Sequence, residues 1–336
     1  MSDIDSWGSV RKVRFKDVLL SLVLLLSQEV DVDRDRIRSE LRELVRKETH
    51  RREELRQQST QRVRRSATSL INYESQINDY LAFARGIGLL NYHDNKVEIE
   101  ENTSKIAKLI GLDREEAEGA ILKKILTSKY SVYLSLLLRL QELEGSFAIP
   151  YQLLGRTKET TEYLQENGFR TDCASFFAAR DLLYDFSLVN WARDPSQKVE
   201  NIFMTSVLSR TEIDGYKHAI SLDTMKISYG KLLKSDEFKE AVMSKYFETT
   251  KGAYDIVLDI MELRDLVTRS LQISDFDFDN LIVVLDGKVF GKSQIILSQG
   301  VVSIPFQSGY LIKAINLPIL PSGRRVEYIS VHQQIS

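Results

Sequence analysis

The feature that most constrains the fold of this chain is a sequence phrase that occurs twice, about one hundred residues apart. The matching pieces are Phe83-Ala-Arg85 with Phe177-Ala-Ala-Arg180, Gly88-Leu-Leu-Asn-Tyr92 with Ser187-Leu-Val-Asn-Trp191, and Asn95-Lys-Val-Glu98 with Gln197-Lys-Val-Glu200. The offset grows from 99 to 102 between the last two pairs. This predicts a three-residue insertion around 194–196, at a turn that tolerates it. We therefore expect two copies of one supersecondary unit.

In each copy the phrase is the end of a helix followed by two short alternating strands. Upstream of the first copy, apolar residues at helical spacing predict helices at 15–27, 33–47 and 66–85, the last ended by Gly86 and Gly88. The expected buried side of this last helix consists of Leu70, Ile71, Ile77, Tyr80, Leu81 and Ala84. The second copy predicts helices at 131–144, 157–166 and 172–186, with Asp172 as the N-cap of the third. Three helices followed by a two-stranded ribbon resemble a winged helix-turn-helix. The resemblance implies a third helix in the DNA major groove and a wing against the backbone.

The rest of the chain differs in character from these two segments. The predicted fold is mainly α with small β-wings, and its domains are two winged-helix modules at 1–101 and 131–205, a helical linker at 102–130, a helical region at 206–273 and a small β-rich domain at 274–336. In the linker, two short helices are split by Gly111, and Asp113 with Glu116 forms a capping box. The helical region holds a helix at 252–271 with an apolar stripe made of Tyr254, Val257, Leu258 and Met261. The β-rich domain has its strands expected at 281–285, 288–290, 293–297, 301–306, 311–317 and 325–331.

Charge points to the first module as the part of the chain that binds nucleic acid. The net charge is only −2, but twelve Lys/Arg against six Asp/Glu lie between Arg34 and Arg65. The candidate DNA-binding residues are Arg62, Arg64, Arg65, Ser66, Thr68, Ser69, Asn72, Gln76 and Lys96. Arginines suit phosphate or guanine, and Asn72 and Gln76, four residues apart on one helix face, suit adenine. A solvated polar face without a ligand is the competing interpretation.

By the same charge criterion, the second module is a weaker candidate for DNA binding. Its third helix carries Asp181 and Asp185 beside Arg180, so negative charge faces phosphate unless these carboxylates turn away. We expect it to have a protein-facing or spacing role, while Arg193 and Lys198 keep a weak phosphate contact open.

Two function classes follow from these patterns, and a third has a single motif behind it. The first is a non-enzymatic protein that binds duplex DNA, such as a transcription regulator. The second is a non-catalytic subunit of a DNA-processing or antiviral-defence complex, and both classes imply a protein partner or a homodimer. The third is a metal-dependent nuclease built on Asp286-Gly-Lys288, with Asp275, Asp277 or Asp279 as further ligand. A type I′ hairpin turn at Asp286-Gly287 is the simpler interpretation.

Several other chemistries find no support in the sequence. Cys173 is the only cysteine and reads as a core residue, which excludes an internal disulfide or a cysteine metal cluster. The four histidines, at 50, 93, 218 and 332, never stand at metal-ligand spacing. Gly86-Ile-Gly88 lacks the third glycine of a phosphate loop. The longest apolar run, 18–26, is too short to cross a membrane. We expect a cytoplasmic protein without a cofactor.

Overall fold

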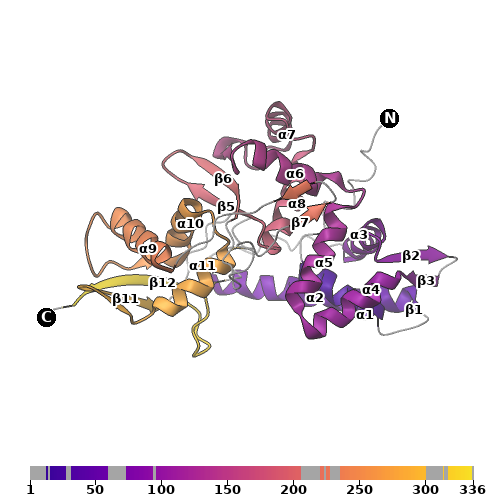
Figure 1. The fold of residues 1–336 in the computed structure, drawn as a ribbon, viewed down its shortest axis with the longest axis horizontal. Coiled ribbons are helices and arrows are strands. Elements are labelled where there is room, and N and C mark those ends of the chain that lie inside the picture. Colours follow the sequence, from indigo (N-terminus) through magenta and orange to yellow (C-terminus); the bar gives the residue numbers. More distant parts are fainter. Residues whose placement is uncertain are drawn as a thin grey trace. The chain divides into compact units, whose positions relative to one another are not determined.

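The computed structural model describes residues 13, 16–27, 32–59, 73–93, 96–205, 220–222, 225–227, 235–299, 313 and 317–334 (Figure 1). The chain divides into two compact units: unit 1 is Met1–Arg51, Arg65–Leu188 and Ile220–Ile227, and unit 2 is Arg52–Arg64, Val189–Ala219 and Ser228–Ser336. Helices dominate both, and the sheets are small and antiparallel, which confirms the mainly α fold class. In the described part of the chain, no helix has the length and apolar character that a membrane span requires.

Unit 1 begins with the three helices and the hairpin expected for the first module, plus the short strand β1, which was not predicted. The elements are α1 (Lys16–Ser27), β1 (Val32–Asp33), α2 (Arg34–Ser59), α3 (Tyr73–Gly86), β2 (Leu90–His93) and β3 (Lys96–Ile99), and the end of α2 from Arg52 onward belongs to unit 2. The strands form an antiparallel sheet in the order β1-β3-β2. Ile37, Leu41 and Val45 are buried, as their spacing on α2 predicts. The helix is much longer than the predicted 33–47, because its polar second half continues to Ser59.

Two further helices complete the first half of unit 1. These are α4 (Glu101–Leu112) and α5 (Arg114–Leu126), and α4 packs against both α1 and α5. The break lies at Asp113 rather than at Gly111, because the Asp113 carboxylate accepts a hydrogen bond from the Glu116 N–H at 3.0 Å and caps α5. Lys124 of α5 donates to the Gly88 carbonyl at 2.6 Å, and burial lowers the pKa of this ammonium. The linker therefore holds the end of α3 in place.

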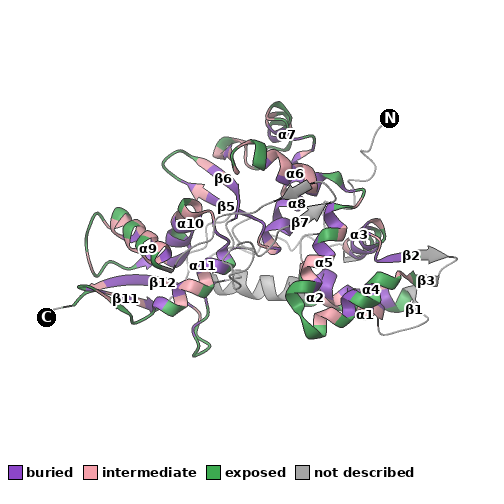
Figure 2. Ribbon diagram, viewed as in Figure 1, coloured by how far each residue is buried: buried purple, intermediate pink, exposed green. Residues whose placement is uncertain are grey.

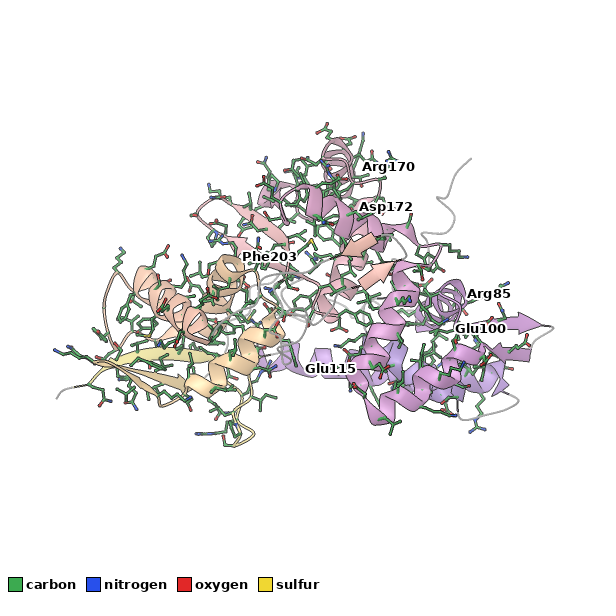
Figure 3. All side chains as sticks on the ribbon, viewed as in Figure 1. Arg85, Glu100, Glu115, Arg170, Asp172 and Phe203 are labelled. Carbon is green, nitrogen blue, oxygen red and sulfur yellow. The ribbon has the colours of Figure 1, made fainter. Side chains whose placement is uncertain are left out.

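The second copy of the phrase follows the same element order. It comprises α6 (Ser131–Glu142), β4 (Ser146–Pro150), the 3-10 helix η3 (Tyr151–Leu153), α7 (Thr157–Glu166), α8 (Cys173–Asp185), β5 (Val189–Asp194) and β6 (Val199–Met204), of which unit 1 holds those up to α8. Unit 1 also contains the hairpin of β7 (Ile220–Leu222) and β8 (Met225–Ile227). Asp172, labelled in Figure 3, lies at the start of α8. It caps this helix as predicted, by accepting from the Ser175 N–H at 2.9 Å. Cys173 is buried.

Both copies show the predicted change from helix to hairpin, with one difference in register. Leu89 donates to the Ala84 carbonyl at 2.9 Å, and Leu188, 99 residues later, donates to the Leu183 carbonyl at 3.0 Å. In the first hairpin Leu90 pairs with Ile99, whereas in the second Val189 pairs with Met204. Between these pairs the second hairpin is therefore six residues longer than the first, not three: each strand and the loop gain two residues. The predicted three-residue insertion was wrong because it came from aligning the sequences of the second strands. Strand pairing, which sets the true offset, was not considered.

Unit 2 combines the β5–β6 hairpin with three helices and a second sheet. The helices are α9 (Ser235–Thr249), α10 (Ile260–Leu271) and α11 (Asp275–Ile282), the last followed by the 3-10 helix η4 (Val283–Leu285). The sheet has the order β10-β11-β12-β9 and consists of β10 (Val289–Phe290), β11 (Ser293–Ser298), β12 (Tyr328–Gln333) and β9 (Leu258–Asp259). Ile295, Ile329 and Val331 turn one face of this sheet into the core.

One predicted helix and one predicted strand in unit 2 are wrong. The helix expected at 252–271 begins only at Ile260, so Tyr254 and Val257 precede it and share no helical stripe with Met261. The strand expected at 281–285 is the end of α11 and η4. That helix starts because the Ser274 hydroxyl accepts from the Asp277 N–H at 3.0 Å, a cap that the run of aspartates and phenylalanines concealed. The strands expected at 301–306 and 311–317 lie outside the described residues except for Lys313 and Leu317.

Candidate nucleic-acid interface and a buried polar network

The predicted DNA-binding residues fall mostly on a segment outside the described residues. That segment holds Arg62, Arg64, Arg65, Ser66, Thr68, Ser69 and Asn72. Gln76 lies in the first turns of α3 and is half-buried. Lys96 is the first residue of β3 and pairs with His93 across the hairpin. The expected Asn72–Gln76 pair therefore stays a prediction.

Helix α3 has the two faces that a groove-binding helix requires. Its buried face holds Ile77, Tyr80, Leu81, Phe83 and Ala84, all but Phe83 expected from the sequence (Figure 2). The opposite face exposes Asn78, Ala82 and Arg85. Arg85 stands in the last turn of the helix, where a positive charge also complements the helix dipole (Figure 3).

A basic face on α2 was not among the predicted site residues. Arg36, Arg42, Arg46 and Lys47 are exposed on the helix whose other side buries Ile37 and Leu41. Arg36 pairs with Glu40 at 3.2 Å and Arg46 with Glu43 at 3.6 Å, both on the surface. The helix holds nine Lys/Arg against six Asp/Glu, so it carries half of the local positive excess seen in the sequence. The helical periodicity of this segment, together with its high arginine content, was the sequence signal that could have identified this basic face.

In the second copy, α8 is buried and its acidic residues turn inward. Arg180 is 4% exposed and donates to the Asp181 carboxylate at 2.6 Å, and Asp181 is itself 3% exposed. Asp185 accepts a hydrogen bond at 2.8 Å from the Lys16 backbone N–H, at the start of α1. This helix presents no face that could enter a groove. The expected protein-facing or spacing role of this module stays a prediction.

The second hairpin is fixed within unit 2. Its β5 strand packs against α10, and Trp191 is fully buried. At the turn, Asp194 accepts from the Ser196 and Gln197 N–H groups and is 2.5 Å from Arg269 of α10. Burial would raise the pKa of Asp194, but the Ser196 and Gln197 hydrogen bonds and the Arg269 charge outweigh it, so this pKa is lowered. Arg193 is half-buried, while Lys198 is exposed.

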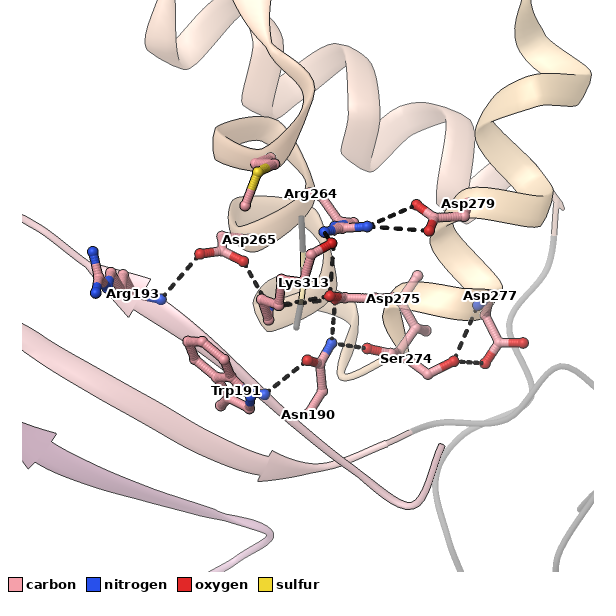
Figure 4. A network of polar contacts seen from close by, with 12 residues as sticks. Asn190, Trp191, Arg193, Arg264, Asp265, Ser274, Asp275, Asp277, Asp279 and Lys313 are labelled. Atoms are coloured by element: carbon pink, nitrogen blue, oxygen red, sulfur yellow. Dashed lines mark hydrogen bonds and ion pairs between the residues drawn. The ribbon is translucent and has the colours of Figure 1, made fainter. Parts of the chain in front are cut away.

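A network of buried charges occupies the centre of unit 2 (Figure 4). Arg264 of α10 is fully buried and donates to both Asp279 oxygens at 3.1 and 3.2 Å and to the Lys313 carbonyl at 2.7 Å. The Lys313 ammonium, also fully buried, lies 2.7 Å from Asp265 and 3.3 Å from Asp275. It sits 4.8 Å from the centre of the Trp191 ring. Side-chain charge thus joins α10, α11 and Lys313.

The network also includes a neutral donor, the Asn190 amide, and a carboxyl group with a raised pKa, Asp279. The Asn190 amide donates to the Asp275 carboxylate at 2.8 Å and to the Ile273 carbonyl at 3.0 Å (Figure 4). Burial raises the pKa of Asp279 to about 7, even though the Arg264 charge acts to lower it. Sequence reasoning missed the network because its members are far apart in the chain. Lys313, a single lysine inside an apolar run, was the one available signal.

The carboxylates proposed as ligands of a metal-dependent nuclease take part in salt bridges and a helix cap. Asp275 and Asp279 contact Arg264 and Lys313, and Asp277 accepts from the Ser274 hydroxyl at 2.7 Å. Among the described residues, no three His, Cys, Asp or Glu side chains gather as a metal site. Asp286-Gly287 is also not the expected type I′ hairpin. It is a type II turn leading from η4 to β10, with Gly287 at φ 71° and a Lys288 N–H to Leu285 carbonyl bond of 3.1 Å.

We expect Asp286→Asn to leave stability unchanged within about 0.5 kcal/mol. The Asp286 carboxylate accepts from the Leu297 N–H at 2.9 Å, and an asparagine carbonyl accepts the same bond. Asp286→Ala removes the acceptor and should cost about 1 kcal/mol. Urea unfolding of the two variants measures both effects. A Mg²⁺-dependent DNA cleavage that disappears in Asp286→Asn, with folding retained, would instead make Asp286 a metal ligand.

A hydrogen-bonded Ser–His–Asp chain lies on β12 and the loop before β9. The Ser330 hydroxyl is 2.8 Å from His332 Nε2, and His332 Nδ1 is 2.7 Å from Asp255. Hydrolytic triads expose the serine and bury the aspartate. Here Ser330 is 6% exposed, whereas the Asp255 side chain is 61% exposed. A buried serine with an exposed aspartate suits a structural role. The hydrogen-bonded chain fixes Asp255, whose φ of 62° is left-handed and whose N–H donates to the Val331 carbonyl.

Comparison with known proteins adds no further constraint on the site. No protein-family model, curated protein or solved structure matches this chain.

Proposed function

We propose that the chain is a non-enzymatic protein that binds duplex DNA through its first module, a winged helix. The observation that carries the proposal is the element order of α1 to β3, in which a helix with one polar face precedes an antiparallel hairpin. Winged helices that bind DNA use this order, with the third helix in the major groove. The basic face of α2, defined by Arg36, Arg42, Arg46 and Lys47, supplies charge for phosphate contacts in the same module.

The second copy supports a division of labour between the modules. Because α8 is buried and the β5–β6 turn is tied to Arg269, this copy packs within the protein and leaves DNA to the first module. A transcription regulator is one form that such a protein takes. The same burial favours a second candidate, a non-catalytic subunit of a DNA-processing or antiviral-defence complex, in which the modules grip proteins. A cytoplasmic location belongs to this proposal as well.

The salt dependence of DNA binding tests the proposal. Replacing Arg62, Arg64 and Arg65 by alanine should weaken duplex binding. It should also reduce the slope of log K against log salt by about 0.9 for each phosphate that the variant no longer neutralises. Fluorescence anisotropy with a labelled duplex at several salt concentrations measures this slope.

A matched control removes three positive charges from the second module. Arg156, Lys158 and Arg170 are exposed, and their replacement by alanine changes the net charge equally. We expect this control to keep the wild-type slope. Equal slopes for the two triple variants, or no duplex binding by the wild-type chain, would favour the complex-subunit candidate.

A further inference from the structure

Helix α3 exposes a narrow strip of side chains that runs along its axis. Among the side chains that the structure describes on this helix, only Asn78, Ala82 and Arg85 are exposed. At about 100° of rotation per residue, Ala82 and Arg85 lie within about 40° of Asn78 around the helix. Half-buried Gln76 lies about 200° away from Asn78, on the opposite side. These three exposed residues, here named the α3 strip, are therefore the part of the helix that a ligand can reach.

Packing on the other sides of α3 holds the strip in place. Tyr130 stacks on Phe83 at 5.1 Å and donates its hydroxyl to the Ala82 carbonyl at 3.2 Å. Just after the helix, Lys124 donates to the Gly88 carbonyl at 2.6 Å. A helix fixed in this way presents its exposed side chains at a constant spacing, which the recognition of a base sequence requires.

We propose that the α3 strip reads base edges in the major groove of duplex DNA, and that Asn78 selects adenine. This inference rests on the proposed function of the first module. An asparagine amide pairs with both N6 and N7 of adenine, a combination that only adenine displays in the major groove. The Ala82 methyl group suits an apolar contact with the thymine methyl group. The target is therefore a duplex site that contains A·T base pairs.

The dimensions of the α3 strip fit a short site in this groove. Asn78 and Arg85 are seven positions apart on the helix. A rise of about 1.5 Å per residue separates them by about 10 Å along the axis, or about three base-pair steps of about 3.4 Å. Ala82 lies between them and has a small side chain, so the helix backbone can approach the bases closely. A long side chain at this position would hold the helix away from the base edges.

The charges of the first module favour base reading as the role of α3. The helix carries Arg85 against Glu74 and Asp79, so it has no positive excess of its own. The basic face of α2 supplies positive charge that complements the phosphates of a duplex. Arg85 stands in the last turn of α3 and suits a phosphate beside the groove. Base preference thus depends on the neutral residues of the strip and affinity on charged ones, and the two can be measured separately.

Selection by the full-length chain from duplexes with a randomised centre tests the proposal. The wild-type chain should enrich duplexes that carry adenine at one fixed position. Asn78→Ala should reduce this preference by about 5- to 150-fold, the range for one bidentate contact, and should keep the wild-type dependence on salt. Asn102→Ala is the matched control, because Asn102 is exposed on α4, and it should keep the preference. Arg85→Ala should instead weaken binding to all duplexes about equally.

Modified bases in the selected duplex locate the contacts on the DNA. An adenine analogue without N7 should weaken binding of the wild-type chain but not of Asn78→Ala. Uracil in place of thymine removes the methyl group, so it should weaken wild-type binding by about fourfold and leave Ala82→Gly unaffected. Equal losses for the wild-type chain and Asn78→Ala with the adenine analogue would overturn the assignment of Asn78.

The outcomes separate this inference from the proposed function. Duplex binding without a base preference, or an adenine preference that Asn78→Ala retains, would overturn the inference and leave DNA binding by the first module standing. Absence of duplex binding by the wild-type chain would overturn both. Circular dichroism checks the fold of each variant, and the comparison with the adenine analogue decides the proposal even if Ala82→Gly does not fold.

Discussion

Arg264→Met is expected to lower the free energy of unfolding of unit 2 by about 3–5 kcal/mol at neutral pH. The methionine fills the space but removes the three hydrogen bonds that the guanidinium donates to Asp279 and the Lys313 carbonyl. Lys313 then remains as the fully buried cation beside Asp265 and Asp275. Protonation of the carboxyl groups relieves part of this cost, so the loss should grow from pH 5 to pH 8. Urea unfolding measures it.

Arg114→Met provides the control for this prediction. Its guanidinium also contacts two carboxylates, Asp17 and Glu118, but the side chain is 58% exposed. Solvent screens such a pair, so we expect a loss below about 1 kcal/mol. Arg264→Lys should lower the free energy of unfolding almost as much as Arg264→Met, because one ammonium cannot make all the contacts of a planar guanidinium. A cost below about 1 kcal/mol for Arg264→Met would show that the network contributes little to stability.

The sequence was most informative where local rules decide the structure. Alternating residues after Gly88 and Ser187 predicted both hairpins, and Asp172 predicted the start of α8, because strand faces and helix caps depend on a few adjacent residues. The burial of Ile77, Tyr80 and Leu81 on α3 followed from helical spacing in the same way.

The predictions failed where distant residues decide the structure. Asp275, Asp277 and Asp279 were predicted as possible metal ligands in a β-rich domain, yet they lie on the helix α11, where Asp275 and Asp279 contact Arg264 and Asp275 also contacts Lys313. Nothing within ten residues of Asp279 specifies those partners. Hairpin register likewise depends on how two strands pair, so the sequence of one strand alone gave the wrong register. The candidate DNA contacts at 62–72 stay predictions, since they lie outside the described residues.

Gly86→Ala should destabilise the first module by about 1–3 kcal/mol, the usual cost of forcing extra volume into a packed core. A β-carbon at Gly86 would lie 2.2 Å from the Tyr130 hydroxyl oxygen and 2.4 Å from its ring. Tyr130 has no room to move away, since it is 2% exposed, stacks on Phe83 at 5.1 Å and donates its hydroxyl to the Ala82 carbonyl. The backbone of Gly86 itself is not left-handed, so the clash alone causes the effect.

A double-mutant cycle with Tyr130→Ala isolates that clash. In the Tyr130→Ala background the obstructing ring is gone, and we expect Gly86→Ala to cost nothing or to stabilise the end of α3. Gly119→Ala is the control for the helical preference of alanine, because Gly119 lies within α5 with nothing within 4 Å of an added β-carbon. It should stabilise the chain by about 0.5–1 kcal/mol. Equal losses from Gly86→Ala with and without Tyr130 would mean that the ring does not set this helix end, and the packing described for α3 would need revision.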